Sequence, residues 1–148
     1  MAADCTAQIT QVYAAKSQAA QATDVQHWQK INLPDNWNQR WPHYSGVAWY
    51  RIDWQPVCES EHAPLNLALY IKAISMAGSV YVNQQLIWQD KNRQEPLTRS
   101  WNQPRYFVLP PNIDRHNTQH IYLRVTGNEL PSPGMGDVYL APLDTVLA

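Results

Sequence analysis

The sequence has little of what nucleic-acid-binding, metal-binding or membrane-spanning proteins need. Of its 148 residues only 16% are charged, the formal net charge is −1, and cysteine occurs twice. The balanced charge leaves no basic stripe to neutralise phosphates, which argues against nucleic acid as a partner. The cysteines form neither a CxxC motif nor a cluster with histidine, which argues against zinc binding and thiol redox chemistry. No apolar run approaches the 18 or so residues of a membrane-spanning helix.

Sequence motifs of catalysis are also missing. There is no G-x-S-x-G, no phosphate-binding loop and no dinucleotide fingerprint. Carboxylates occur singly along the chain, so a glycosidase pair cannot be identified. We therefore expect that this domain is not an enzyme and holds neither metal nor cofactor. Histidines lie in predicted loops or at strand ends without metal-ligand spacing, which is typical of surface residues: His27, His43, His62, His116 and His120.

The aromatic residues are mostly those with a polar atom. Phenylalanine occurs once, whereas there are 7 tryptophans and 8 tyrosines. Such rings suit half-buried sheet faces and binding surfaces, because one part is apolar and another forms hydrogen bonds. With 45% hydrophobic residues, a chain of this length is one globular unit that buries roughly two-thirds of its unfolded surface.

From Val25 onward the hydrophobic pattern has the period of two that is typical of β-strands. In Val47–Trp54 one face carries Ala48, Tyr50, Ile52 and Trp54, and the other carries Val47, Trp49, Arg51 and Asp53. The short strands, separated by turn signals, predict a mainly β fold, an antiparallel β-sandwich or jelly roll. The other predicted strands are Leu65–Lys72, a hairpin of Ser79–Val82 and Leu86–Gln89 around Asn83-Gln84-Gln85, Tyr106–Leu109, Ile121–Val125 and Val138–Leu140.

The N-terminal segment has a different composition. From Thr6 to about Thr23 it is rich in alanine and glutamine, and its apolar residues have helical spacing. This predicts an N-terminal helix, capped by Asp4 or Thr6. We accordingly divide the chain into a helical segment, residues 1–24, and a jelly-roll domain, residues 25–148.

The two cysteines are open to two interpretations. Cys5 and Cys58 are either buried free thiols or a disulfide that tethers the N-terminal segment to the end of a strand. We favour the disulfide, because the segment near Cys5 has little else to hold it. Closing a loop of this length stabilises a fold by about 4 kcal/mol in the chain-entropy description. The bridge requires an oxidising compartment such as the periplasm.

A series of motifs carries a family resemblance. W-x-x-I-x-L-P-D-x-W, G-V-A-W-Y-R, L-A-L-Y-I, A-G-S-V-Y-V-N, L-P-P-N-I-D and H-I-Y-L-R-V follow one another between Trp28 and about Leu140. This order is similar to the galactose-binding-like jelly roll. That fold is known as the sugar-binding domain of family 2 glycoside hydrolases. It is also known as the periplasmic domain of bacterial membrane-bound histidine kinases and diguanylate cyclases.

The sensor version of this family resembles the chain more closely. The shared features are the early cysteine, the stretch Glu95–Pro104 and the turn Gly134-Met135-Gly136. One departure is the hairpin, where the family has Asn-Gly and this chain has Asn83-Gln84. Asn83 can still adopt the left-handed conformation that such a turn needs.

Two loops carry the residues predicted to bind a ligand. A sugar site stacks a ring against the sugar and surrounds it with polar groups, and arginine adds a bidentate donor. Alternatively, Trp37 and Trp101 plug the ends of the sandwich, and Arg51 and Arg99 pair with aspartates. Arg51 is either part of a salt bridge to Asp53 or Asp35 or a site residue, and we favour the salt bridge. We expect Trp49, Tyr50 and Trp54 to lie in the core. The predicted ligand-binding residues are Trp37, Arg40, Trp41 and His43 in one loop and Arg99, Trp101 and Asn102 in the other.

The resemblance implies a function in signalling. We expect the periplasmic ligand-sensing domain of an inner-membrane protein, a histidine kinase or diguanylate cyclase, that binds a saccharide or another small periplasmic molecule. Such receptors are anchored in the membrane and signal as homodimers, with the segment Val138–Leu140 next to the exit. Met1–Asp4 is interpreted as an added start, and the end at Ala148 as a boundary inside a longer protein. The alternatives are a carbohydrate-binding module of a secreted glycoside hydrolase and a protein-interaction domain without a small ligand.

Overall fold

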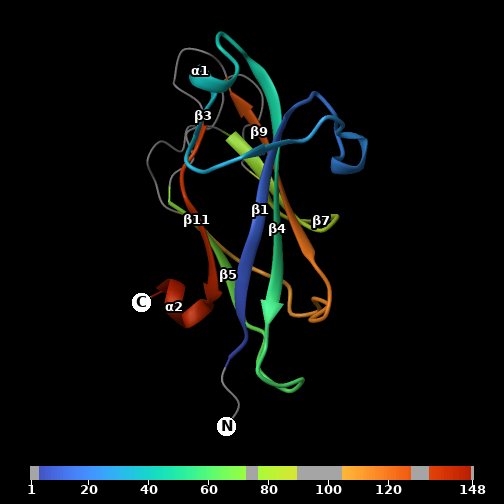
Figure 1. Cartoon of the computed structure of the whole chain (residues 1–148), viewed down its shortest axis with the longest axis vertical. Coiled ribbons are helices and arrows are strands. Elements are labelled where there is room, and N and C mark those ends of the chain that lie inside the picture. Colours follow the sequence, from blue (N-terminus) through green and yellow to red (C-terminus); the bar gives the residue numbers. More distant parts are fainter. Residues whose placement is uncertain (1–3, 73–76, 90–104, 128–133, 148) are drawn as a thin grey trace.

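The computed structural model describes residues 4–72, 77–89, 105–127 and 134–147, and it is a two-layered antiparallel β-sandwich (Figure 1). The larger sheet has the order β2-β1-β4-β9-β6-β7, the smaller has the order β11-β5-β8, and β10 pairs with β3. Among these residues, no helix combines the length and the apolar character that crossing a membrane takes. The elements are β1 Thr6–Lys16, η1 Ala22–Asp24, β2 Gln29–Ile31, β3 Asp35–Asn36, α1 Trp37–Arg40, β4 Gly46–Val57, β5 Leu67–Ile71, β6 Ala77–Val82, β7 Gln85–Gln89, β8 Arg105–Val108, β9 Gln119–Gly127, β10 Gly134–Met135, β11 Val138–Pro142 and α2 Leu143–Leu147.

The core lies between the two sheets. Side chains of β4 point alternately to the two faces of the large sheet, so every second one enters the core. Tyr50, Ile52 and Trp54 are fully buried in this core, as the sequence predicts, together with Leu67, Leu69 and Ile71 of β5. Val47 and Trp49 belong to a second, smaller cluster on the opposite face of the large sheet. The predicted strands and the predicted faces of β4 are therefore confirmed.

The predicted N-terminal helix is wrong, because Thr6–Lys16 forms β1 in the middle of the large sheet. This strand pairs with β2 on one side and with β4 along nearly its whole length on the other, with a bulge between Ile9 and Gln11. Val12 and Ala14 point into the core, a period of two that no helix produces. The helix preference of alanine and glutamine amounts to tenths of a kcal/mol per residue, and burial against two neighbouring strands outweighs it.

The predicted hairpin is present as a tight turn between β6 and β7. Val82 pairs with Gln85, so Asn83 and Gln84 form the turn and Gln85 already belongs to the strand. Asn83 has the left-handed φ of 54° that the sequence analysis allowed. Its side chain also holds β9: Nδ2 donates to Gln119 Oε1 at 3.0 Å, and Oδ1 accepts from the backbone N–H of His120 at 3.1 Å.

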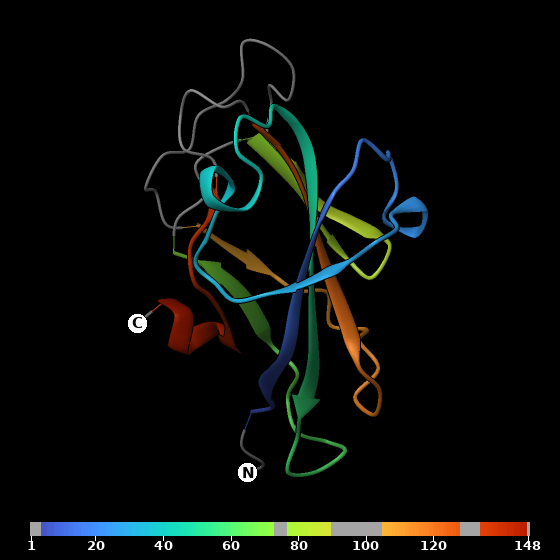
Figure 2. The ribbon, with the colours of Figure 1, turned by 45° about the horizontal axis from the view of Figure 1, so that its top comes forward.

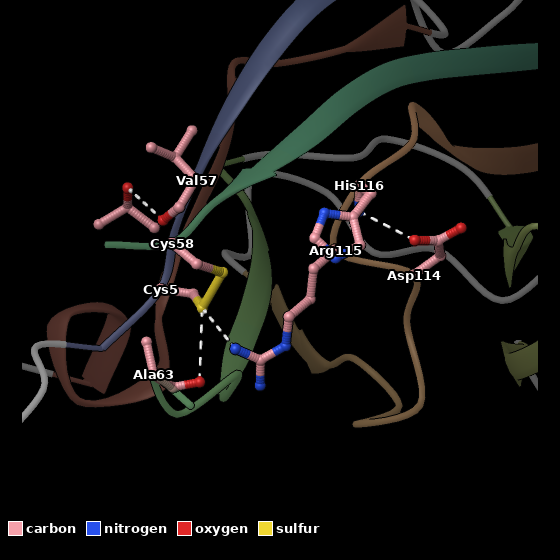
Figure 3. Close-up of a disulfide and its surroundings, with 8 residues drawn as sticks. Cys5, Val57, Cys58, Ala63, Asp114, Arg115 and His116 are labelled. Carbon is pink, nitrogen blue, oxygen red and sulfur yellow. Dashed lines mark hydrogen bonds between the residues drawn. A yellow bond between two sulfur atoms is a disulfide. The ribbon is translucent and has the colours of Figure 1, made fainter. Parts of the chain in front are cut away.

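The predicted disulfide between Cys5 and Cys58 is present (Figure 3). Cys5 directly precedes β1 and Cys58 directly follows β4, so the bridge joins the two strands where they end together. The buried Cys5 is also held by its backbone N–H, which donates to Pro64 O at 2.8 Å. Arg115 Nη1 approaches Cys5 Sγ at 3.6 Å. Cys5, at the start of β1, is thus fixed to one end of the sandwich.

We expect the bridge to be a main source of stability. Replacing both cysteines (Cys5→Ala with Cys58→Ala) frees a loop that the bridge closes across a separation of 53 residues. The free energy of unfolding should fall by about 4 kcal/mol, measured by urea denaturation. The reduced wild-type protein should match the double variant. An unchanged denaturation midpoint in both would contradict a stabilising bridge.

Candidate ligand-binding site at the loop end

Four of the seven predicted ligand-binding residues lie together at the end of the sandwich opposite the disulfide (Figure 1). Trp37 and Arg40 belong to α1, and Trp41 and His43 follow in the turn that leads to β4. We call this segment, residues 37–43, the loop end. Arg99, Trp101 and Asn102 lie outside the described residues, so their share in the site stays a prediction.

Trp37 is part of the core and not a stacking platform. Its side chain is 1% exposed, and its Nε1 donates to the hydroxyl of Tyr50 at 2.9 Å. Its ring packs against Trp41 and Tyr44, with centroids 5.7 and 5.4 Å away. Trp37 therefore plugs the end of the sandwich, which was the alternative interpretation of the sequence.

A buried carboxylate organises the loop end. Asp35 is almost fully buried and accepts a hydrogen bond from the Tyr50 hydroxyl at 2.5 Å and one from Arg40 Nε at 2.7 Å. Burial raises the pKa of Tyr50 well above its usual value, and the neighbouring charge of Asp35 raises it further. Tyr50 therefore stays protonated and keeps donating. The chain Trp37–Tyr50–Asp35–Arg40 fixes the direction of the arginine.

The turn before β4 is built around Tyr44. Its hydroxyl donates to Val47 O at 2.6 Å and accepts from Gln18 Nε2 at 3.1 Å, and burial raises its pKa. Gly46 has φ 141°, and a Cβ there would lie 2.6 Å from Gln18 Nε2. Only glycine fits this position without strain. The turn that carries His43 is thus held from both sides.

The loop end presents a small set of groups to solvent. They are the half-buried ring of Trp41, the guanidinium of Arg40 at 20% exposure and the exposed imidazole of His43. A ring edge flanked by fixed N–H donors suits a sugar or another molecule rich in acceptor oxygens. No group of three metal-ligating side chains occurs among the residues that the structure describes.

Sequence reasoning missed a second group of aromatic and charged residues, on the outer face of the large sheet. Arg51 forms the predicted salt bridge to Asp53, with Nε and Oδ1 3.0 Å apart. Its guanidinium carbon also lies 4.2 Å from the ring centre of Tyr13 and 5.3 Å from that of Trp28. The alternation of side chains along β4 could have indicated this group, because it places Arg51 on the outer face. Tyr13 escaped notice because its segment was predicted to be helical.

The fold has counterparts among solved structures, and three of them are of low sequence identity to this chain. A calcium-binding mutant of Bacteroides uniformis β-glucuronidase 2 matches with a TM-score of 0.68 at 16% identity, over 93% of this chain and 18% of that one. A glycosyl hydrolase family 2 member from Bacteroides cellulosilyticus DSM 14838 matches with 0.67 at 15% identity, over 93% and 20%. A putative β-galactosidase from Bacteroides fragilis matches with 0.66 at 16%, over 95% and 23%.

These matches show the fold, a galactose-binding-like jelly roll. The chain spans about a fifth of the length of the proteins that it matches. Neither protein-family models nor curated protein sequences give a match. At this identity the side chains of a site are not expected to be shared, because function depends on residues placed on a fold and not on the fold itself.

Tyr50→Phe tests the buried network. It removes the donor to Asp35 and the acceptor of Trp37, and it should lower the free energy of unfolding by about 1–3 kcal/mol at neutral pH, measured by chemical denaturation. The control Tyr139→Phe, on a ring that is 52% exposed, should change it by less than about 0.5 kcal/mol.

The pH dependence gives the same variant a second readout. In the unfolded chain the Tyr50 phenol ionises near pH 10, whereas burial keeps it protonated in the folded chain to higher pH. Its contribution is therefore complete below about pH 10, and above it the free energy of unfolding falls by up to about 1.4 kcal/mol per pH unit. Tyr50→Phe should make this fall less steep. Equal slopes for wild type and variant would contradict the burial of a protonated Tyr50.

Proposed function

We propose that the chain is a non-catalytic saccharide-binding domain of a longer carbohydrate-active protein. The observation that carries the proposal is the extent of the structural match. The fold is shared over 93–95% of this chain but over only 18–23% of proteins that include a β-glucuronidase and a putative β-galactosidase. A domain of this size is therefore one part of those proteins, and the greater part of each lies outside it.

The pairing of Asp35 and Asp53 with arginines supports a binding function over a catalytic one. Asp35 is paired with Arg40 and Tyr50, and Asp53 is paired with Arg51 and lies 2.6 Å from His120. A glycosidase needs two carboxyl groups that face one glycosidic bond, one of them free to give a proton. Two carboxylates that are each committed to an arginine do not supply this. The exposed groups at the loop end are suited to holding a sugar.

We place the domain outside the cytoplasm, and in the periplasm if the source is a bacterium with two membranes. The support is the disulfide, because reducing conditions in the cytoplasm disfavour such bridges. Cys5 is buried and its bridge closes the end of the sandwich, which is typical of a structural disulfide.

A membrane-anchored sensor is the second candidate. Two of the sequence features that resemble sensor domains can be located in the structure. The early cysteine, Cys5, forms the disulfide, and Gly134-Met135 forms β10, which pairs with β3 beside the loop end. In that function a ligand at the loop end would bias β11, and homodimers would transmit the change. Reading the gene beyond Ala148 separates the candidates. An apolar span of about 20 residues supports the sensor, and a catalytic domain supports the hydrolase.

Glycan binding tests the main proposal. The purified domain should bind saccharides on a glycan array, and the strongest should then be titrated by calorimetry. His43→Asn, which keeps a residue that tolerates the positive φ of 64°, should weaken binding about five- to tenfold through loss of a polar contact. Trp41→Phe should act in the same direction.

The matched control is His62→Asn, an exposed histidine in the turn next to the disulfide at the other end of the sandwich. It should leave the affinity within twofold of wild type. If the wild-type domain binds no saccharide, the proposal fails.

A further inference from the structure

A row of aromatic and basic side chains crosses the outer face of the large sheet. Lys30, Tyr13, Arg51, Tyr122 and Tyr81 occupy paired positions on β2, β1, β4, β9 and β6. They face outward because the residues before or after them, such as Val12, Ile52 and Ile121, point into the core. At the usual spacing of strands such a row is roughly 19 Å long. We call this surface the outer row.

Arg51 is the fixed centre of the outer row. Tyr13 and Trp28 lie against its guanidinium, and Nε and Nη2 donate to the two oxygens of Asp53 at 3.0 and 3.3 Å. Its side chain remains 22% exposed. Nη1 has no hydrogen-bond partner among the described residues. One edge of the guanidinium is thus immobilised by the protein and the other is available.

His120 extends this rigid group along β9. Its Nδ1 lies 2.6 Å from Asp53 Oδ1, and its ring centre lies 6.0 Å from that of Tyr122. The imidazole is 39% exposed. Arg51, Asp53 and His120 therefore form one connected polar unit beside the rings, with its side chains already ordered before a ligand arrives. Pre-ordering lowers the entropy cost of binding.

The segment of residues 17–28 forms a wall along one side of the outer row. Figure 2 shows this segment leaving β1, forming η1 and returning across β1 as β2. It is fixed at Ala19, whose carbonyl accepts from Trp49 Nε1 at 3.0 Å and from Arg124 Nε at 3.3 Å. Trp28, near its end, packs against Tyr122 with ring centres 6.2 Å apart.

A cavity continues the outer row beyond Tyr81. It has a volume of about 300 Å³ and lies between the wall and the β6–β7 turn, lined by residues 20–23, Tyr81, Asn83 and Gln84. This volume is in the range of small-molecule sites. The hydroxyls of Tyr13, Tyr81 and Tyr122 form no hydrogen bond with any described residue. The rings of Tyr13, Tyr122 and Tyr81 pack against Arg51, Trp28 and Trp49, respectively, but they are only half-buried, so part of each side chain remains exposed.

We propose that the outer row, together with this cavity, is a second saccharide site that takes a chain of several sugar units. The inference rests on the proposed function, because it assumes the same ligand class at a different place. Rings stack on the C–H faces of sugars, and the Arg51–Asp53–His120 unit offers fixed donors and acceptors to hydroxyl groups. The basic side chains Lys30, Arg51 and Arg124 outnumber the carboxylates Asp53 and, on the wall, Asp24, so acidic sugars are also accommodated.

The composition of this face favours a saccharide over a protein partner. Aspartate and lysine are depleted in protein interfaces, whereas Asp53 is paired with Arg51 beside the outer row and Lys30 lies at one end of it. The outer face of the small sheet provides a contrast. There Tyr106, Val108 and Tyr139 are about half exposed, and none of these three side chains is charged at neutral pH.

Variants of the outer row test the inference with the array-selected glycan. Arg51→Lys keeps the charge and a partner for Asp53 but removes the planar fork, and it should weaken binding at least tenfold. Tyr122→Phe removes a hydroxyl only, and a threefold loss is expected. The matched control Tyr70→Phe, on a half-buried tyrosine of the small sheet, should leave this affinity within twofold. In the ¹H–¹⁵N spectrum the Trp28 indole signal, assigned with Trp28→Phe, should shift with the same Kd.

The outcomes separate this inference from the proposed function. If only His43→Asn and Trp41→Phe weaken binding and the Trp28 signal does not move, the loop end is the site and the outer row is not, while the proposed function stands. If wild type binds no glycan at all, both proposals fail. Losses in Arg51→Lys and Tyr122→Phe with an unchanged Tyr70→Phe support the second site.

Discussion

The pairing of β1 with β4 is the interaction on which the rest of the structure depends. β4 is twelve residues long and lies next to β1 and β9 in the middle of the large sheet, so its register fixes both faces of that sheet. The disulfide holds this register at one end, where Cys5 and Cys58 flank the paired Thr6 and Val57. A slip of one residue would exchange the two faces. Tyr50 would then point outward, and Arg51 and Asp53 would both enter the core.

The same strand links the core to both candidate sites. Tyr50 points inward and, through Asp35, orients Arg40 at the loop end. The next residue, Arg51, points outward and is held by Asp53 between two rings. In each case a charged group is fixed by a hydrogen-bonded carboxylate, which offsets the cost of taking it partly out of water. The groups proposed to bind are therefore as rigid as the sheet that carries them.

Local pattern allowed part of this to be predicted from the sequence. The period-two hydrophobic pattern of β4 and β5 predicts the face of the sheet to which each side chain points. The disulfide was predicted from the positions of the two cysteines alone. The N-terminal strand could not be predicted this way, because its partner in β4 lies more than thirty residues away and its alanine and glutamine content resembles a helix. The outer row escaped for the same reason: Tyr13, Arg51, Tyr122 and Tyr81 come from four strands and meet only through register. Trp37 was ambiguous, since a tryptophan in a loop looks the same whether it faces solvent or core.

The likeness to family 2 glycoside hydrolases bears on the fold and leaves the binding residues to be argued from this chain. We expect a binding face to differ from a merely exposed one in having charged groups that are held in place by hydrogen bonds. On the small sheet the exposed tyrosines stand beside valine and alanine. On the large sheet the rings of Tyr13 and Tyr122 flank Arg51. One edge of its guanidinium is paired with Asp53, and the other edge faces outward. Such a surface keeps its geometry without a ligand, so the binding that we propose would cost little entropy.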